Sequence, residues 1–122
     1  MSKENLNSGK RSEAQAELFL KRRGYVVLER NYKTRSAEID IVAREKGAIC
    51  FVEVKSRSSE RFGSPQEAVT PAKQAKIATA ARVYLQEHNL LERRVRFDVV
   101  AIVQGAGEDK ISLVKGAFEP RE

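Results

Sequence analysis

Two acids and one lysine stand beside short apolar stretches of this sequence. Glu53 and Lys55 follow the apolar run Ile49–Val52, and Asp40 has an isoleucine on either side. Because side chains alternate between the two faces of a strand, Glu53 and Lys55 are expected on the same face. Charged groups at such places cost free energy unless they are paired or bind a ligand. Two carboxylates that share a divalent ion, with a lysine beside them, are suited to hydrolysing a phosphodiester.

These residues allow a catalytic and a structural interpretation. In the catalytic one, Asp40 and Glu53 ligate Mg²⁺ or Mn²⁺, and Lys55 orients or helps to deprotonate the attacking water. In the structural one, both acids are surface carboxylates paired with lysines, and Lys55 forms an ion pair with Glu38 or Glu53. Apolar residues flank the acids in both stretches, which favours the catalytic interpretation.

The two acids meet only if the segments that carry them pair in the right register. We expect two strands joined by a hairpin turn at Lys46 and Gly47. With this two-residue turn, Glu45 opposes Ala48, and counting back places the two acids opposite one another. A turn with one residue more or fewer, without a compensating bulge, would send the acids to opposite faces of the sheet.

Helix signals stand on both sides of this hairpin. Residues 1–8 are expected to form a disordered tail, with Ser8 as the N-cap of a helix that ends near Arg23. Thr70 and Pro71 are typical of a helix N-cap and first turn, and this second helix should end at about residue 88.

The remaining apolar stretches predict the strands and the fold class. Strands are expected at about residues 25–31, 37–43, 48–56, 97–103 and 111–114. The order α-β-β-β-α-β-β predicts one α/β domain over residues 9–122, with a mixed central sheet flanked by helices. A right-handed parallel crossover should join the third and fourth strands.

The composition excludes several classes of protein. The chain has 122 residues, a net charge of +6, one cysteine and one histidine. Cys50 is expected as a buried apolar side chain, and so few Cys and His residues argue against disulfides and a zinc cage. No apolar run approaches the roughly 20 residues of a membrane span, and no signal peptide is evident. We therefore expect a cytoplasmic protein without membrane contact, and the positive charge favours a nucleic acid as partner.

Basic residues concentrate at loops and element ends, from which side chains can reach phosphates. Lys73, in the first turn of the second expected helix, can also be helped by the helix N-terminus. The polar connection over residues 57–69 is long, and it is either a functional loop or a plain crossover. The residues expected to bind nucleic acid are Arg30, Lys33, Arg35, Arg57, Arg61 and Lys73.

Several motifs of this chain, taken in order, resemble those of known nucleases. They are Ser12-Glu13, Arg30-Asn31, Ala37-Glu38-Ile39-Asp40, Phe51-Val52-Glu53-Val54-Lys55, Phe62-Gly63, Lys73 and Arg96-Phe97-Asp98-Val99-Val100. The chain resembles the PD-(D/E)xK nuclease superfamily over about residues 9–103. At closer range it resembles the YraN family of small bacterial proteins assigned as endonucleases, which are similar to archaeal Holliday junction resolvases.

The resemblance implies a fold and a chemistry. The fold is restriction-endonuclease-like, with an α-β-β-β-α-β core, and the activity is that of a Mg²⁺-dependent deoxyribonuclease acting on DNA, including branched DNA. The Val54 carbonyl would be a third metal ligand beside Asp40 and Glu53. Glu13 would join the catalytic residues through a water-mediated metal contact, or it is an ordinary first-turn acid of the helix. Resolvases act as symmetric dimers, so a homodimer is allowed, although the sequence shows no clear dimer surface.

Three classes of function stay open at this point. The first is the nuclease, and the second is a non-catalytic nucleic-acid-binding module on the same fold. The third is a basic adaptor for a protein partner. Asp98 is expected in a structural ion pair with Arg96 in each case, and Glu38 in a supporting role.

Overall fold

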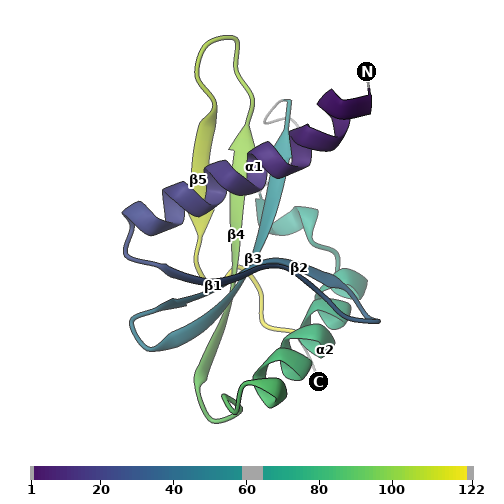
Figure 1. Ribbon diagram of the computed structural model, residues 1–122, viewed down its shortest axis with the longest axis vertical. Coiled ribbons are helices and arrows are strands. Elements are labelled where there is room, and N and C mark those ends of the chain that lie inside the picture. The colour runs from purple at the N-terminus through teal and green to yellow at the C-terminus, as the bar shows by residue number, and fades with distance from the viewer. Residues whose placement is uncertain (1, 59–64, 121–122) are drawn as a thin grey trace.

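The helices and strands follow one another along the chain in the predicted order (Figure 1). The computed structural model describes residues 2–58 and 65–120, and the side chains of residues 10–58 and 67–120. The elements are α1 (Ser2–Arg22), β1 (Val26–Lys33), β2 (Glu38–Glu45), β3 (Ala48–Arg57), the short 3-10 helix η2 (Pro65–Ala68), α2 (Pro71–Glu87), β4 (Arg94–Val103) and β5 (Lys110–Val114).

The strands form one mixed sheet with the order β1-β2-β3-β4-β5. Only β3 and β4 are parallel among these neighbours, and α2 provides the connection that a parallel pair requires. The helices cover opposite faces, because Leu20 of α1 lies in one buried cluster with Cys50, and Ile77 of α2 lies in the other with Phe51. Cys50 and Phe51 are successive residues of β3, so this strand is buried on both sides. The mixed α/β, restriction-endonuclease-like core is confirmed.

The β2–β3 hairpin has the predicted register. Lys46 and Gly47 have φ values of 49° and 83°, which is the backbone of a two-residue type I′ turn. Glu45 pairs with Ala48, and the antiparallel pairing continues without a bulge to Ile41 and Val52. The next residue on each strand is one of the two acids, so both lie on the same face.

α1 begins earlier than the sequence predicted. Residues 2–8, expected as a disordered tail, belong to the helix, and Ser8 lies inside it instead of capping it. No proline interrupts this stretch, and Glu4 and Leu6 are good helix formers, so the helix continues through Gly9. The other end agrees with the prediction, because Gly24 follows the last turn with a φ of 91°.

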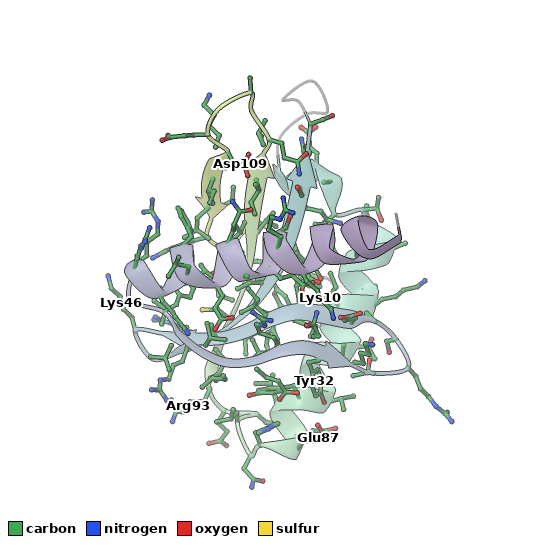
Figure 2. All side chains as sticks on the ribbon, turned by 45° about the horizontal axis from the view of Figure 1, so that its top comes forward. Lys10, Tyr32, Lys46, Glu87, Arg93 and Asp109 are labelled. Atoms are coloured by element: carbon green, nitrogen blue, oxygen red, sulfur yellow. The ribbon has the colours of Figure 1, made fainter. Side chains whose placement is uncertain are left out.

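α2 begins at the predicted cap and ends against β1. The Thr70 hydroxyl oxygen accepts a hydrogen bond from the Lys73 amide at 3.2 Å, and Pro71 is the first helical residue. At the other end, the Tyr32 hydroxyl of β1 donates to the Glu87 carboxylate (Figure 2). These contacts fix the helix across the sheet, with its first turns beside the end of β3.

β4 also begins earlier than predicted, at Arg94 instead of Phe97. The two arginines at its start alternate with apolar residues, which suits a strand with one polar face, and the parallel ladder already starts at the Ala48–Arg94 pair. The sequence prediction had assigned only the continuous apolar stretch, residues 97–103, to this strand. Within the described residues, no helix is both long and apolar enough to cross a membrane.

Candidate active site

An open cleft lies where β2 and β3 meet the first turns of α2. Its volume is about 560 Å³. The residues that line it come from the β1–β2 loop, from both strands and from α2, and they include the predicted acids, Lys55 and Lys73. They are Ser36, Ala37, Glu38, Asp40, Glu53, Val54, Lys55, Thr70, Ala72, Lys73 and Lys76.

Asp40 and Glu53 converge inside this cleft. Asp40 Oδ2 accepts a hydrogen bond from the Val54 amide at 2.8 Å, and the two acidic side chains are within hydrogen-bond distance of one another. Glu53 is only 3% exposed, and among the described residues its Oε1 has no hydrogen-bond partner. Burial, and after it the charge of Asp40, raises the pKa of Glu53 far above its ordinary value. A cation shared by both carboxylates would relieve this cost.

Two lysines lie beside the acids. Lys55 comes from β3 and Lys73 from the first turn of α2, and their side chains are within hydrogen-bond distance. Burial lowers the pKa of Lys55, and so does Lys73, whereas Glu53 and Asp40 raise it. Two ammonium groups this close repel one another unless an anion lies between them, so the pair is suited to a phosphate.

Asn31 links two further acids at the edge of the cleft. Its Nδ2 donates to Glu13 Oε1 and to Glu38 Oε2, both at 2.9 Å. Glu38 lines the cleft, whereas Glu13 does not, so Glu13 is connected to the cleft through Asn31. The sequence analysis had placed Asn31 in a motif with Arg30 but had assigned it no role of its own. The available signal was a polar residue inside a strand, of a type that tolerates its positive φ of 54°.

Arg30 lies apart from the cleft residues. Its guanidinium pairs with Glu17 of α1 at 2.7 Å. Glu17 also pairs with Lys21 at 2.9 Å, and this i,i+4 contact is a common one on helix surfaces. Arg30 is therefore partly neutralised, and it is not among the residues that line the cleft.

The other residues predicted to bind nucleic acid differ in position. Lys33 and Arg35 are exposed next to the β1–β2 loop, beside the cleft. Arg57 is half-buried at the end of β3. Arg61 lies outside the described residues, as does the motif Phe62-Gly63.

The donor set of the cleft suits a hard divalent cation. Asp40 and Glu53 offer carboxylate oxygens, and the backbone of Val54 is next to them. In the described part of the chain, no group of three His, Cys, Asp or Glu side chains could hold a metal. Mg²⁺ does not need such a group, because one or two carboxylates commonly bind it while it keeps several waters. The unpartnered Glu53 oxygen makes these residues fit the ion.

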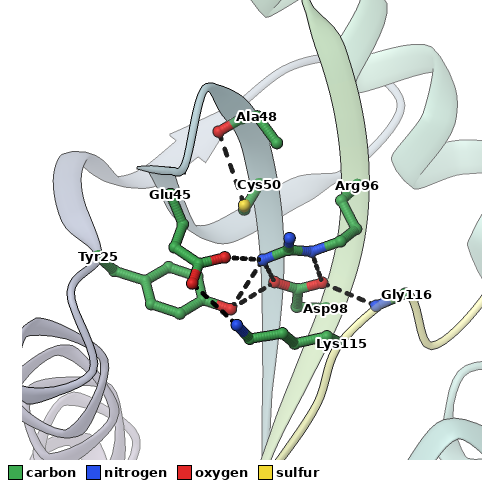
Figure 3. A network of polar contacts seen from close by, with 8 residues as sticks. All are labelled: Tyr25, Glu45, Ala48, Cys50, Arg96, Asp98, Lys115 and Gly116. Carbon is green, nitrogen blue, oxygen red and sulfur yellow. Dashed lines mark hydrogen bonds and ion pairs between the residues drawn. The ribbon is translucent and has the colours of Figure 1, made fainter.

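A second polar cluster, which we name the Arg96 network, lies toward the opposite ends of β2, β3 and β4 (Figure 3). Arg96 donates to Asp98 and to Glu45, each at 2.9 Å. The Tyr25 hydroxyl donates to Asp98 at 2.8 Å, and Lys115 pairs with Glu45 at 2.8 Å. The predicted ion pair of Asp98 with Arg96 is confirmed. Both buried acids have cationic partners, so the network is structural.

The fold and the cleft define a mixed α/β protein of the restriction-endonuclease-like class, with paired acids and lysines where a β-hairpin meets a helix. The chain belongs to the family described as "Uncharacterised protein family UPF0102", whose model matches residues 12–102. This is the YraN family that the sequence motifs had indicated.

Relatives in several bacteria match nearly the whole chain. A UPF0102 protein of Desulforapulum autotrophicum is 45% identical over 119 residues, which cover 98% of both chains. A UPF0102 protein of Syntrophus aciditrophicus is 47% identical over 116 residues, covering 95% of this chain and 91% of the relative. One of Geobacter metallireducens is 43% identical over 98% of both chains. The matched stretch of the family model, residues 12–102, thus spans the whole segment that forms the cleft.

Proposed function

We propose that this protein is a metal-dependent endonuclease that hydrolyses phosphodiester bonds in DNA. The proposal is carried by the half-buried Asp40 and the buried Glu53, one of whose oxygens is unpartnered, in an open cleft beside two lysines. Stability does not account for such a pair, because an amide or apolar residue would remove both the desolvation cost and the repulsion. Perturbed titratable groups in a cleft occur preferentially at functional sites.

The cleft residues would divide the work of hydrolysis. Asp40 and Glu53, with the Val54 carbonyl, would hold Mg²⁺ or Mn²⁺, which when bound polarises the phosphate and lowers the pKa of a water. Lys55 and Lys73 bind oxygens of the phosphate and offset the charge that develops on them. Because its pKa is lowered, Lys55 exchanges a proton with water more readily than an ordinary lysine does.

Cleavage of labelled DNA tests the proposal. Linear, flapped and four-way substrates are incubated with the protein and Mg²⁺, Mn²⁺ or a chelator. We expect cleavage only with metal, and a loss of about 10²–10³-fold or more in Asp40→Asn and Lys55→Met, since each removes a group that stabilises the transition state. DNA binding measured by anisotropy should remain in Asp40→Asn, because the basic residues of the cleft are unchanged.

Glu92→Gln is the matched control, because it removes an exposed acid away from the cleft and should cleave like the wild type. Cleavage that persists undiminished in Asp40→Asn would show that the acids are not catalytic.

A non-catalytic nucleic-acid-binding module is the second candidate. It is favoured by the finding that, among the described residues, no three His, Cys, Asp or Glu side chains are placed to hold a metal together. If no substrate is cut at high protein concentration while DNA binding stays strong and salt-dependent, this candidate replaces the nuclease.

The substrate panel also addresses the finer parts of the proposal. The resemblance to junction resolvases leads us to propose branched DNA as the preferred substrate, cut by a homodimer that meets two equivalent strands. Preference for the four-way substrate, together with a dimeric mass in sedimentation, would support this.

A further inference from the structure

A second group of cations lies away from the cleft. The end of α1 and the β2–β3 turn lie at the left in Figure 1, whereas the β1–β2 loop and the start of α2 lie at the right. Figure 2 shows Lys46 and Arg93 on the left side and Lys10 to their right. We name six exposed residues of this region the far-end cations: Arg22, Arg23, Arg44, Lys46, Arg93 and Arg94.

Strand pairing brings the far-end cations side by side. Arg44 pairs with Val26, which follows shortly after Arg23 at the end of α1. Arg94 pairs with Ala48, which comes directly after the β2–β3 turn. Neighbouring strands are about 4.8 Å apart, so charges from α1, β2, the turn and β4 gather around one end of the sheet.

Neighbouring acids do not neutralise this surface. None of the far-end cations forms an ion pair with another described side chain. The buried acids nearby, Glu45 and Asp98, already have Arg96 and Lys115 as partners. Glu92 is an exposed acid next to Arg93 in the sequence and can offset part of its charge. Lys46 and Arg94 are therefore the preferred positions for substitution.

Arg94 and the cleft lie on different faces of the sheet, whereas Arg44, in step with Val42, lies on the face of the cleft but at the other end of β2. Phe97 of β4 packs on the α2 side, so Arg94 points to the α1 side, in step with Val100. Glu53 shares the α2 face with Phe51. Ala48, which pairs with Arg94, is also about 17 Å from Glu53 along β3, at 3.3 Å per residue. A straight duplex held in the cleft therefore does not also contact Arg94.

We propose that the far-end cations bind the phosphate backbone of a second duplex segment. The surface suits a duplex better than a small anion, because the charges are spread over several elements and a duplex presents one charge per about 1.7 Å. This inference rests on the proposed function in one respect: it assumes that a first duplex segment is bound in the cleft. One chain could then hold two duplex arms of a branched molecule at once.

Two charge reversals of equal size at different places test the proposal. The far-end variant combines Lys46→Asp with Arg94→Glu, and aspartate is chosen because it tolerates the positive φ of the turn. The control combines Lys10→Glu with Arg11→Glu, two exposed residues of α1 away from the far end. Both double variants change the net charge by the same amount, so a difference between them reports position.

The measurement is binding of a labelled blunt duplex of about 12 base pairs, roughly 40 Å long, in chelator. We expect two duplexes per chain for the wild type and for the control, and one for the far-end variant. The slope of log K against log salt should fall by about two in the far-end variant. Its cleavage of a short linear duplex in Mg²⁺ should match that of the control.

The same stoichiometry and salt slope in the far-end variant and the control would overturn the proposal. So would a far-end variant that loses binding of polyglutamate but keeps both duplexes, because the partner would then be an acidic protein. If the far-end variant fails to fold, the double variant Arg22→Gln with Arg93→Gln, which removes two positive charges without adding negative ones, replaces it. The same loss of one duplex is expected. Lys73→Glu distinguishes failure of this proposal from failure of the proposed function. If the cleft binds no DNA, Lys73→Glu leaves the number of bound duplexes unchanged, while the far-end variant still binds one duplex fewer than the wild type.

Discussion

At the scale of single residues, Glu53 is the most informative side chain. It is almost fully buried, its nearest charged neighbour is another acid, and one of its oxygens has no partner among the described residues. Lys55 and Lys73 offset this only in part, because both are partly exposed. The free energy lost here is expected to be recovered when a cation binds.

Glu53→Gln should therefore raise the stability of the metal-free protein. Because the pKa of Glu53 is raised far above its ordinary value, folding at pH 7 makes this carboxylate take up a proton, and the neutral amide removes that cost. The amide can also donate a hydrogen bond to Asp40, so we expect a gain of about 1–3 kcal/mol in the free energy of unfolding at pH 7. Urea unfolding in chelator measures it. Mg²⁺ should raise the melting temperature of the wild type and leave that of Glu53→Gln unchanged.

Glu119→Gln provides the comparison, because Glu119 is an exposed acid outside the cleft. Its unfolding free energy should stay within about 0.5 kcal/mol of the wild type. A Glu53→Gln protein that is less stable than the wild type would contradict the view that this carboxylate is kept for a ligand.

Part of the candidate site could be predicted from the sequence because it depends on one hairpin. A two-residue turn at Lys46 and Gly47 determines which residues of β2 face those of β3, and both acids lie in this ladder. The bridge from Glu13 through Asn31 to Glu38 could not be predicted. It depends on how α1 lies against β1, and that placement is decided by packing of the whole sheet.

At the scale of elements, the segment after β5 fastens the start of β4. The Gly116 amide donates to Asp98 at 2.9 Å, and the Ala117 amide donates to the Phe97 carbonyl at 2.8 Å. Lys115 joins the Arg96 network on the α1 side, while Phe118 is buried in the cluster on the α2 side. This short segment therefore contacts both layers of the molecule.

The Arg96 network should make the free energy of unfolding depend on pH. Hydrogen bonds from Lys115, and then from Arg96, lower the pKa of Glu45 in the folded protein below its ordinary value near 4.5. The ionised carboxylate thus stabilises the fold above about pH 4.5, and this contribution is lost as the pH falls through the lowered value. The free energy of unfolding should exceed that of Glu45→Gln by about 1–3 kcal/mol at pH 7, and the gap should shrink below pH 4.5.

Urea titrations at several pH values measure this difference in the free energy of unfolding. The polar and charged groups of the network around Glu45 are Tyr25, Asp98, Arg96 and Lys115. Glu92→Gln, which lies outside the network, should show no comparable gap. A gap that widens on acidification would mean that the pKa of Glu45 is raised by folding.

Element types were easier to predict than element ends. Thr70 and Pro71 are a local signal, and the structure starts α2 there. The early start of β4 depends on pairing of Arg94 with Ala48, two residues far apart in sequence. Local residue types do not predict such a pairing. Because arginines alternate with apolar residues at the start of β4, this part of the strand contains no continuous apolar run.

At the scale of the whole molecule, the sheet separates two buried clusters. Leu20 is fully buried on the α1 side and Ile77 on the α2 side, and the sheet backbone stands between them. Side chains separated in this way share no contacts, so their contributions to stability should be independent.

Leu20→Ala and Ile77→Val should thus have additive effects. We expect losses of about 3–5 kcal/mol and about 0.5–1.5 kcal/mol, because each removes methyl groups from a buried cluster. The double variant should lose the sum within about 0.5 kcal/mol in urea unfolding. Ile77→Val combined with Val99→Ala, both in the α2-side cluster, is the matched pair in which coupling is expected. Strong coupling across the sheet would show that the two layers do not pack independently.

Cys50 lies in β3, fully buried, and is the chain's sole cysteine. Burial raises the pKa of its thiol to about 11, so a disulfide reagent meets almost no thiolate and has no path to the sulfur while the sheet is closed. The rate of thiol modification therefore reports how often the central strand opens, without any label added to the chain. Slower modification in Mg²⁺ would reveal occupancy of the acid pair even when no DNA is present.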